Sequence, residues 1–340
     1  MNQLPASSSQ LIANRRQAGA CNAKAGSWKL EAGSWKPEAG SWKLTLNGVL
    51  VIDKPVGPTS HDVVARARRA LGTRRIGHTG TLDPLAAGVL PLVVGSATRL
   101  ASLFSGGDKE YVAGIRLGLA TETYDAAGRE SVPPAPAGIT RDEVDVALEA
   151  FRGSFDQFPP PYSAKKIDGV RAYTLARKRA PVQPTAARVT VHHLTIEDYS
   201  DGLIVVRVRA SAGFYVRSLA HDLGSKLGCG AHLEQLRRVR AGTFTEGDAV
   251  MLSTLEQEGI DAARRIVPLE QLLPEIPAVV LTERDRERVA HGGDVHAEGD
   301  PRQIVGAGTT RRRLVDGSGR LVALAEMREG GVLHPVIVLV

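Results

Sequence analysis

The chain has 340 residues, which is enough for one large hydrophobic core and a smaller companion domain. Apolar residues make up 43% of it and charged residues 24%, a balance that excludes a fibrous or wholly disordered chain. Lysine and arginine (43) exceed aspartate and glutamate (37), and the pI of about 9.4 favours a polyanionic partner without requiring one.

Cysteine content and hydropathy narrow the class further. Cys21 and Cys229 lie far apart and form no CxxC motif, so we predict neither a disulfide framework nor a zinc site. No apolar run reaches the roughly 18 residues that a membrane helix needs, and the N-terminus lacks a hydrophobic signal core. We therefore expect a cytoplasmic protein with no membrane association.

The N-terminal segment differs from the rest of the chain. Three tandem AGSWK units with a seven-residue period contain all three tryptophans. That spacing could align the tryptophans on a helix, but Gly26, Gly33, Gly40 and Pro37 oppose a stable one. We predict a disordered extension over residues 1–46, with the fold beginning at Asn47.

From Asn47 onward, strand and helix patterns alternate. Short apolar or alternating runs predict strands, and periodic runs with a capping residue predict helices. Ser60 is the expected N-cap of the first helix. Thr140 and Glu143 are expected to form a capping box at a later one. The predicted strands are 48–53, 90–95, 109–118, 187–198, 203–211 and 332–340, and the predicted helices are 60–71, 97–104, one from 140, 214–228 and 282–292. Beyond residue 274 short β-rich pieces surround one helix, which predicts a second, smaller domain.

A proline-flanked segment concentrates the positive charge. Residues 165–188 contain one acid, Asp168, and seven basic residues: Lys165, Lys166, Arg171, Arg177, Lys178, Arg179 and Arg188. A helical arm of this composition could clamp a phosphate backbone, with Tyr162 and Tyr173 as stacking faces. It could equally be a solvated surface helix. A second basic group, Arg66 to Arg75, leads into the most unusual loop of the chain, so nucleic acid is the leading partner.

Common catalytic motifs are absent from the sequence. It contains no GxxxxGK[ST], GxSxG, HExxH or complete GxGxxG, so nucleotide hydrolysis, serine hydrolysis and zinc proteolysis lose their usual support. The pairs His61–Asp62 and His221–Asp222 lack further ligands at matching spacing, and His192 and His193 read as strand residues. We expect no metal and no cofactor.

The loop GHTGTLDPLAAGVLP (residues 77–91) carries the remaining chemical signal. Gly77, Gly80 and Gly88 permit tight turns, and Pro84 fixes the backbone directly after Asp83. An aspartate on such a turn could be a preorganised nucleophile or base. It could also be a structural residue that caps the turn, and the loop alone does not separate these interpretations.

This loop resembles the catalytic motif of the TruB-type tRNA pseudouridine synthases of bacteria, which modify the uridine of the TΨC loop. Three more blocks resemble the family in its order: GVLVIDKPVGPTSHDVV (48–64), KEYVAGIRLG (109–118) and ASAGFYVRSLAHDLGSKLGCGAHLEQLRRVRAG (210–242). Together they span nearly all of 47–245. Thr81 stands where some members have alanine, and the tryptophan repeats have no counterpart.

The resemblance implies the fold and the domain organisation. It implies an α/β (α+β) pseudouridine-synthase fold, a mixed and largely antiparallel sheet flanked by helices, over residues 47–273. An RNA-binding insertion at about 156–188 and a small PUA-like β-rich RNA-binding domain at 274–340 would complete it. The implied reaction is isomerisation of uridine 55 of tRNA to pseudouridine, without metal or cofactor.

The resemblance also implies roles for individual residues. Asp83 would be the catalytic carboxylate, by attack at C1′, by attack at C6 or by removal of the 2′ proton, and Arg217 would keep it ionised. Tyr111 would stack on the extruded base and is a candidate to take the C5 proton. The residues of the uridine pocket would be His78, Tyr215, Leu236 and Lys54. Contacts with the RNA backbone would come from Lys165, Lys166, Arg177, Lys178 and Arg179.

Three alternatives stay open at this point. The nearest is a relative that works within an RNA-guided particle, as dyskerin-like proteins do, although the basic insertion argues against it. A second is a tRNA-folding chaperone or binding module. A third is a glycosidase-like hydrolase, which would need a second carboxylate near Asp83, and none stands out in the sequence. We expect the protein to act on the T-arm as a monomer.

Overall fold

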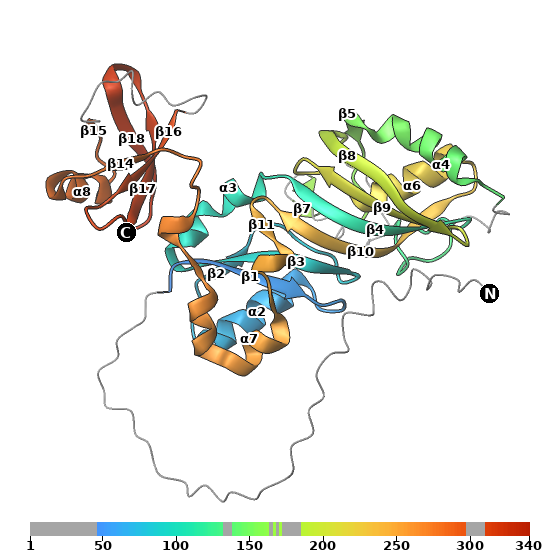
Figure 1. Ribbon diagram of the computed structural model, residues 1–340, viewed down its shortest axis with the longest axis horizontal. Helices are drawn as coiled ribbons and strands as arrows, with labels where there is room; N and C mark the ends of the chain where they lie inside the picture. The colour runs from blue at the N-terminus through green and yellow to red at the C-terminus, as the bar shows by residue number, and fades with distance from the viewer. Residues whose placement is uncertain (1–45, 132–137, 163–165, 168–169, 172–184, 297–309) are drawn as a thin grey trace, which may run out of the picture. The chain divides into compact units, whose positions relative to one another are not determined.

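The computed structural model describes residues 46–131, 138–162, 166–167, 170–171, 185–296 and 310–340 (Figure 1). The predicted disordered extension lies outside these residues, apart from Leu46. So do Lys165, Arg177, Lys178 and Arg179 of the basic segment. No helix in the described ranges is long and apolar enough to cross a membrane.

A large mixed sheet forms the body of the described chain (Figure 1). Only the β1–β12 and β3–β10 pairs within it are parallel, so the predicted mixed, largely antiparallel sheet is confirmed. Strands β2 (Ile76–His78), β11 (Phe244–Thr245) and β13 (Val267–Pro268) pair at its sides. The main path runs β12 (Val250–Met251), β1 (Gly48–Lys54), β3 (Ala86–Val94), β10 (Ala231–Ala241), β4 (Lys109–Leu117), β9 (Leu203–Ala210), β8 (Ala187–Ser200) and β5 (Gly153–Gln157).

Helices cover this sheet in two groups. At the β8–β9 end, α4 (Arg141–Leu148) and α6 (Val216–Lys226) contribute Leu148 and Leu219 to a core shared with β4 and β10. At the β1 end, α2 (Ser60–Ala70) and α7 (Leu252–Glu258) pack on β1 and β3. The short helices η1 (Gly95–Leu100) and α3 (Ala101–Ser105) follow β3. Two adjoining cores therefore lie along the sheet.

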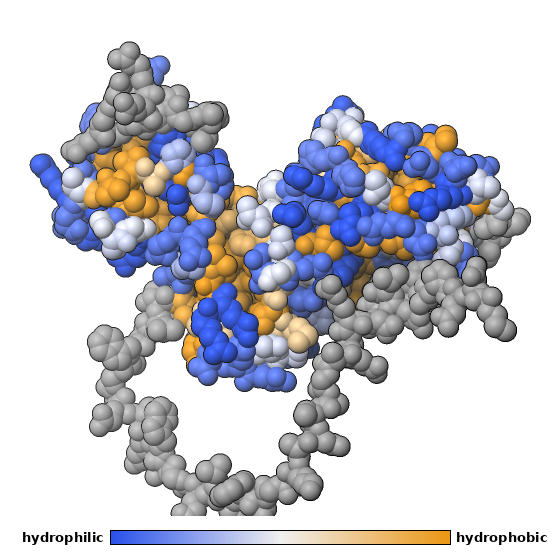
Figure 2. All heavy atoms as spheres, in the orientation of Figure 1, coloured by the Kyte–Doolittle hydropathy of each residue, from blue (hydrophilic) through white to orange (hydrophobic). Residues whose placement is uncertain are grey.

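The two ends of the sheet differ in how many faces they bury. In β1, Leu50 and Ile52 belong to one core and Val49 and Val51 to another, which explains why this strand reads as an unbroken apolar run. In β9 two of the outward positions, Arg207 and Arg209, carry charge instead. Arg207 pairs with Glu110 at 3.1 Å. Figure 2 shows hydrophilic residues gathered over β8 and β9, the solvent face that the alternating pattern predicts.

The caps of two helices test the sequence-based predictions directly. The capping box of Thr140 and Glu143 at α4 is confirmed. The expected cap of α2 was wrong by one residue, because Thr59 rather than Ser60 accepts the bond from the Asp62 N–H. Ser60 is buried and uses its hydroxyl elsewhere, as described below.

The close approach of β3 and β10 depends on a glycine. Gly88 has φ +103°, and a Cβ placed there would lie 2.2 Å from the carbonyl oxygen of Arg238. Any side chain would push β10 away from β3. Gly88 thus allows the strand that follows the Asp83 turn to pair with the central strand of the sheet.

Among the described residues, a second, five-stranded sheet and a helix form the β-rich C-terminal domain, as predicted. Its core gathers Leu281, Val289, Leu314, Val322 and Leu333. The helix is α8 (Glu283–Ala290), and the strand order is β14 (Ala278–Val280), β16 (Arg311–Val315), β17 (Leu321–Met327), β18 (Val332–Val338) and β15 (Val295–His296).

Candidate active site

Asp83 lies on a turn between β2 and β3 that is held from two sides. The Ser60 hydroxyl accepts a bond from the Leu82 N–H at 2.8 Å and donates to the Leu82 carbonyl at 3.0 Å. On the other side, the Gly57 N–H donates to the Pro84 carbonyl at 2.8 Å. Leu82 is therefore fixed to the first residue of α2 and Pro84 to the β1–α2 loop, which limits the movement of the Asp83 carboxylate.

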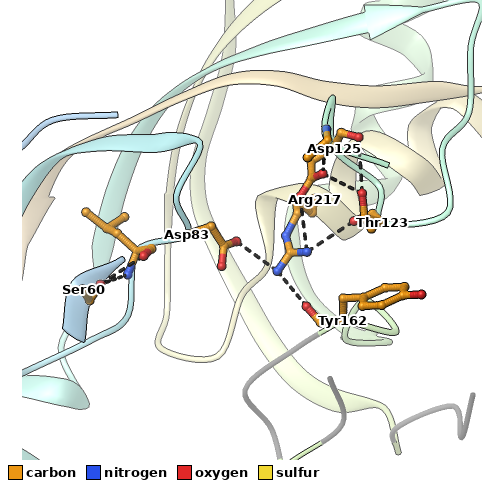
Figure 3. A network of polar contacts seen from close by, with 8 residues as sticks. Ser60, Asp83, Thr123, Asp125, Tyr162 and Arg217 are labelled. Carbon is orange, nitrogen blue, oxygen red and sulfur yellow. Dashed lines mark hydrogen bonds and ion pairs between the residues drawn. The ribbon is translucent and has the colours of Figure 1, made fainter. Parts of the chain in front are cut away.

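Arg217 reaches Asp83 from the first turn of α6 (Figure 3). Its Nη2 lies 2.9 Å from Asp83 Oδ2 and donates to the Tyr162 carbonyl at 3.0 Å. The side chain of Arg217 is only 8% exposed, whereas that of Asp83 is 36% exposed. The arginine is thus the fixed, buried partner, and the carboxylate keeps an open side that a substrate can approach.

A second carboxylate, Asp125, lies on the other side of the same guanidinium (Figure 3). Arg217 Nη1 donates to Asp125 Oδ2 at 3.4 Å and to the Thr123 carbonyl at 3.3 Å. Asp125 is itself held, because the Thr123 hydroxyl and the Ala127 N–H donate to its Oδ1 at 2.6 and 3.1 Å. One cation therefore joins two carboxylates, and planar guanidinium geometry fixes both contacts.

Sequence reasoning missed Asp125. Its segment TETYDAAG shows only the turn-forming residues of a loop, and the contact with Arg217 is long-range. It also missed Gln157, which is 2% exposed. The Gln157 side chain accepts from the Tyr215 N–H at 2.8 Å and donates to the Tyr215 carbonyl at 3.0 Å, so it fixes the start of α6.

Tyr111 and Leu236 lie near each other on the neighbouring strands β4 and β10. Both are half-buried, and both pack against the two adjoining cores. Leu236 is in register with Ala86, three residues after Asp83, and with Ala113 on β4. The sheet therefore places an aromatic ring and an aliphatic side chain beside the Asp83 turn, which is the kind of surface on which a planar base can stack.

Lys54 and His78 lie beside the turn that carries Asp83. Lys54 is fully buried and its Nζ donates to the carbonyls of Pro55 and Ala86 at 2.9 and 2.7 Å. Burial, together with the charge of Arg238, lowers the pKa of Lys54 to about 8, although Asp83 acts in the opposite direction. Burial also lowers the pKa of His78, and its Nδ1 accepts from the Gly80 N–H at 3.3 Å.

The other predicted residues fall in two groups. Tyr215 is the N-cap of α6 and stands two residues before Arg217. Lys166 lies on the short strand β6 (Lys166–Ile167), which pairs with β7 (Val170–Arg171). Lys165, Arg177, Lys178 and Arg179 are outside the described residues. Within the described ranges, no group of three or more His, Cys, Asp or Glu side chains could hold a metal ion.

Solved structures share this fold. The chain matches the crystal structure of an archaeal box H/ACA sRNP Nop10–Cbf5 complex with a TM-score of 0.65 and 27% identity, over 87% of each chain. A structure of an H/ACA RNP bound to a substrate RNA containing 2′-deoxyuridine matches with a TM-score of 0.64 and 26% identity, over 87% of this chain and 86% of the other. The fold is that of a pseudouridine synthase.

Sequence comparisons then give the family. The model for the N-terminal domain of TruB family pseudouridylate synthases matches residues 68–216, and that for the tRNA pseudouridylate synthase B C-terminal domain matches 217–274. tRNA pseudouridine synthase B of Solibacter usitatus is 42% identical over 86% of this chain and 100% of its own length. The Symbiobacterium thermophilum protein of that name is 46% identical over 73% and 82%. The chain belongs to the TruB family of pseudouridylate synthases.

The boundary between the two family models falls inside the candidate active site. Asp83 and Asp125 lie in the first matched segment, and Arg217 is the first residue of the second. The ion pair therefore joins both matched segments. The five-stranded C-terminal sheet lies beyond the second one.

Proposed function

We propose that this protein isomerises uridine 55 in the TΨC loop of tRNA to pseudouridine, with Asp83 as the catalytic group. Relatives that are 39–46% identical over most of the chain carry the name tRNA pseudouridine synthase B, which supports tRNA as the substrate. One structural observation carries the proposal: a partly exposed carboxylate on an anchored turn, 2.9 Å from a buried arginine.

The chemistry needs an ionised carboxylate. The N1–C1′ bond breaks, the uracil turns and C5 bonds to C1′, with Asp83 attacking C1′, attacking C6 or removing the 2′ proton. Arg217 is the counter-charge of that carboxylate in each route, because its guanidinium lies 2.9 Å from Asp83 Oδ2. A primary isotope effect with 2′-deuterated uridine is expected only if Asp83 removes the 2′ proton, so this measurement separates that route from the other two.

Access to the uridine requires extrusion from the folded loop, which costs on the order of a few kcal/mol. Tyr111 and Leu236 would offset this cost by stacking on the extruded base, while His78 would occupy the space that it leaves. The half-buried state of Tyr111 and Leu236 supports this role, because each keeps some surface for contact. Lys54 and Tyr215 would support the pocket walls.

Tritium release tests the proposal. A T-arm stem-loop labelled with tritium at C5 of the target uridine should lose its label when the purified protein is added, without metal or nucleotide. Asp83→Asn should abolish release, since an amide can neither attack nor remove a proton. Asp145→Asn is the matched control, because Asp145 also pairs with an arginine but is 56% exposed and lies on α4. Normal release by Asp83→Asn would contradict the mechanism.

The similarity to H/ACA proteins supports one competing function, an enzyme that depends on a guide RNA. The curated relatives favour the stand-alone enzyme, because one of them is covered over its full length. The same stem-loop assay without any guide RNA decides between them. A stand-alone enzyme releases tritium from the bare stem-loop, whereas a guide-dependent enzyme releases none.

The basic segment and the C-terminal domain would hold the tRNA, with residues 47–273 as the catalytic domain and 274–340 as an accessory RNA-binding domain of a monomer. Charge reversal at Arg177, Lys178 and Arg179 should weaken tRNA binding. It should also flatten the dependence of log K on log salt by about 0.7 to 0.9 for each phosphate that the protein no longer neutralises. An unchanged slope in filter binding would show that this segment does not touch phosphate.

A further inference from the structure

Arg238 is a buried cation at the centre of the large sheet. Arg238 is only 1% exposed and lies on the middle strand, β10. Its Nε donates to the Val89 carbonyl at 2.7 Å and its Nη2 to the Gly80 carbonyl at 3.2 Å. The first carbonyl belongs to β3, and the second lies three residues before Asp83. Arg238 therefore holds the strand and the turn that present the catalytic carboxylate.

Charge around Arg238 is not balanced by an acid. No ion pair between described residues includes it, and two other buried cations, Lys54 and Lys109, lie close enough to be affected by it. Burial, with the charge of Arg238 as a further cause, lowers the pKa of each lysine to about 8. Placing an arginine among buried cations costs free energy, because desolvation of an unpaired charge is unfavourable. This cost indicates that the charge of Arg238 has a role.

Arg238 is the register partner of Tyr111 in the sheet. The two residues are paired across β4 and β10, and the guanidinium and the phenolic oxygen interact electrostatically. One side chain thus lies beside Tyr111 and donates to the Gly80 carbonyl. It links the tyrosine of the proposed base-stacking surface to the turn that carries Asp83.

We propose that Arg238 is a positioning residue for the isomerisation: it holds the Tyr111 oxygen where it accepts the C5 proton and fixes that oxygen relative to the Asp83 turn. This inference rests on the proposed function. A neutral residue could hold the carbonyls of Val89 and Gly80, but only a cation also stabilises the negative charge that develops on the phenolic oxygen during proton transfer.

The step balances without an added reactant. After C5 has bonded to C1′, the C5–H bond breaks and its electron pair forms the C5=C6 bond. The electrons of the N1=C6 bond move to N1, which takes a proton from water. The Tyr111 oxygen accepts the C5 proton while its own hydroxyl proton passes to water. Arg238 stabilises the negative charge that develops on this oxygen during the transfer and releases no proton itself.

The isotope effect at C5 tests this role. Arg238→Gln removes the charge and Arg238→Lys keeps it but shortens the reach, so the lysine variant should recover part of the loss. In single-turnover reactions with stem-loops carrying hydrogen or deuterium at C5, Arg238→Gln should be about 10- to 100-fold slower than the parent. Its C5 isotope effect should be larger than the parent's, because proton removal then limits the rate, while stem-loop affinity stays the same.

A second substitution shows whether Arg238 acts through Tyr111. In a Tyr111→Phe background, which removes only the hydroxyl, Arg238→Lys should cause no further slowing. Arg240→Gln is the matched control, because Arg240 is an exposed residue of the same strand that pairs with Glu110, and it should leave the isotope effect unchanged.

The failures are distinguishable. No pseudouridine from the parent protein would refute the proposed function, and a parent-like rate for Tyr111→Phe would refute the role of the tyrosine. If the parent is active and Tyr111→Phe is slow, additive losses in the double variant would overturn the inference about Arg238. An unchanged C5 isotope effect in both Arg238 variants would overturn it too. Arg238→Lys retains the buried charge, so it serves if the glutamine variant fails to fold.

Discussion

Asp125, the second carboxylate that contacts Arg217, gives a prediction in which the burial of an ion pair matters more than the distance between its charges. Asp125→Asn removes a charge that lies 3.4 Å from Arg217 Nη1, where the two side chains are 9% and 8% exposed. At that separation the gross Coulomb energy is about 5 kcal/mol for an effective dielectric constant of about 20. Desolvation offsets part of it, and Arg217 keeps Asp83 as a partner. We therefore expect a net cost of about 2 to 3 kcal/mol.

This cost should divide between stability and catalysis. Arg217 without Asp125 is free to shift relative to Asp83, and each 1.4 kcal/mol lost from the transition state slows the reaction about tenfold. The expected result is a single-turnover rate on the T-arm stem-loop that is about 10- to 100-fold lower, with a reduced unfolding free energy in urea. Stem-loop affinity should change little, because Asp125 is buried.

An exposed aspartate provides the control for this experiment. Asp145 lies 3.1 Å from Arg152, which is closer than Asp125 lies to Arg217, but the side chain of Asp145 is 56% exposed. Asp145→Asn should therefore cost no more than about 1 kcal/mol and leave the rate unchanged. Equal effects of the two substitutions, or a parent-like rate in Asp125→Asn, would refute the reasoning from burial.

Three further substitutions have expected outcomes. Ser60→Ala leaves two buried backbone groups of Leu82 without partners and should lower the unfolding free energy in urea by about 2 to 3 kcal/mol; a loss below about 0.5 kcal/mol would argue against this anchor. Burial raises the pKa of Asp222 to about 6, so its unfavourable contribution grows as pH rises from about 4 to 6, and Asp222→Asn should raise the Tm at pH 8 but not at pH 4. Gly88→Ala would place a Cβ 2.2 Å from the Arg238 carbonyl oxygen and should unfold the protein or lower its Tm strongly; a parent-like melting curve would contradict the close approach of β3 and β10.

Local signals in the sequence predicted much of the fold. The apolar run of β1 and the alternation in β9 arise from burial on two faces and on one face, so the pattern carries the information directly. The capping box at α4 is likewise local, since its residues are three apart in sequence. The cap of α2 was missed because Thr59 and Ser60 are both good capping residues, and only the backbone angles distinguish them.

The site was less predictable, because its contacts are long-range. Asp83 stood out through its glycine-rich turn, and its link to Arg217 was expected only from the family resemblance. Nothing local marks Asp125 as the second partner of that arginine, since its carboxylate also forms the turn contacts that its segment suggests. Arg238 reads as one of several arginines of a basic strand, and its burial follows from the order of the strands.

Arg217 also contacts main-chain atoms, at the carbonyls of Thr123 and Tyr162. A carbonyl oxygen is present whatever the side chain, so mutation can change either residue without removing the acceptor that the arginine uses. Natural variation at residue 162 is therefore compatible with an unchanged arginine environment, whereas Thr123 also holds Asp125 through its hydroxyl. At residue 162, selection on that environment should act on the path of the backbone, through turn length and glycine or proline placement, more than on which side chain stands there.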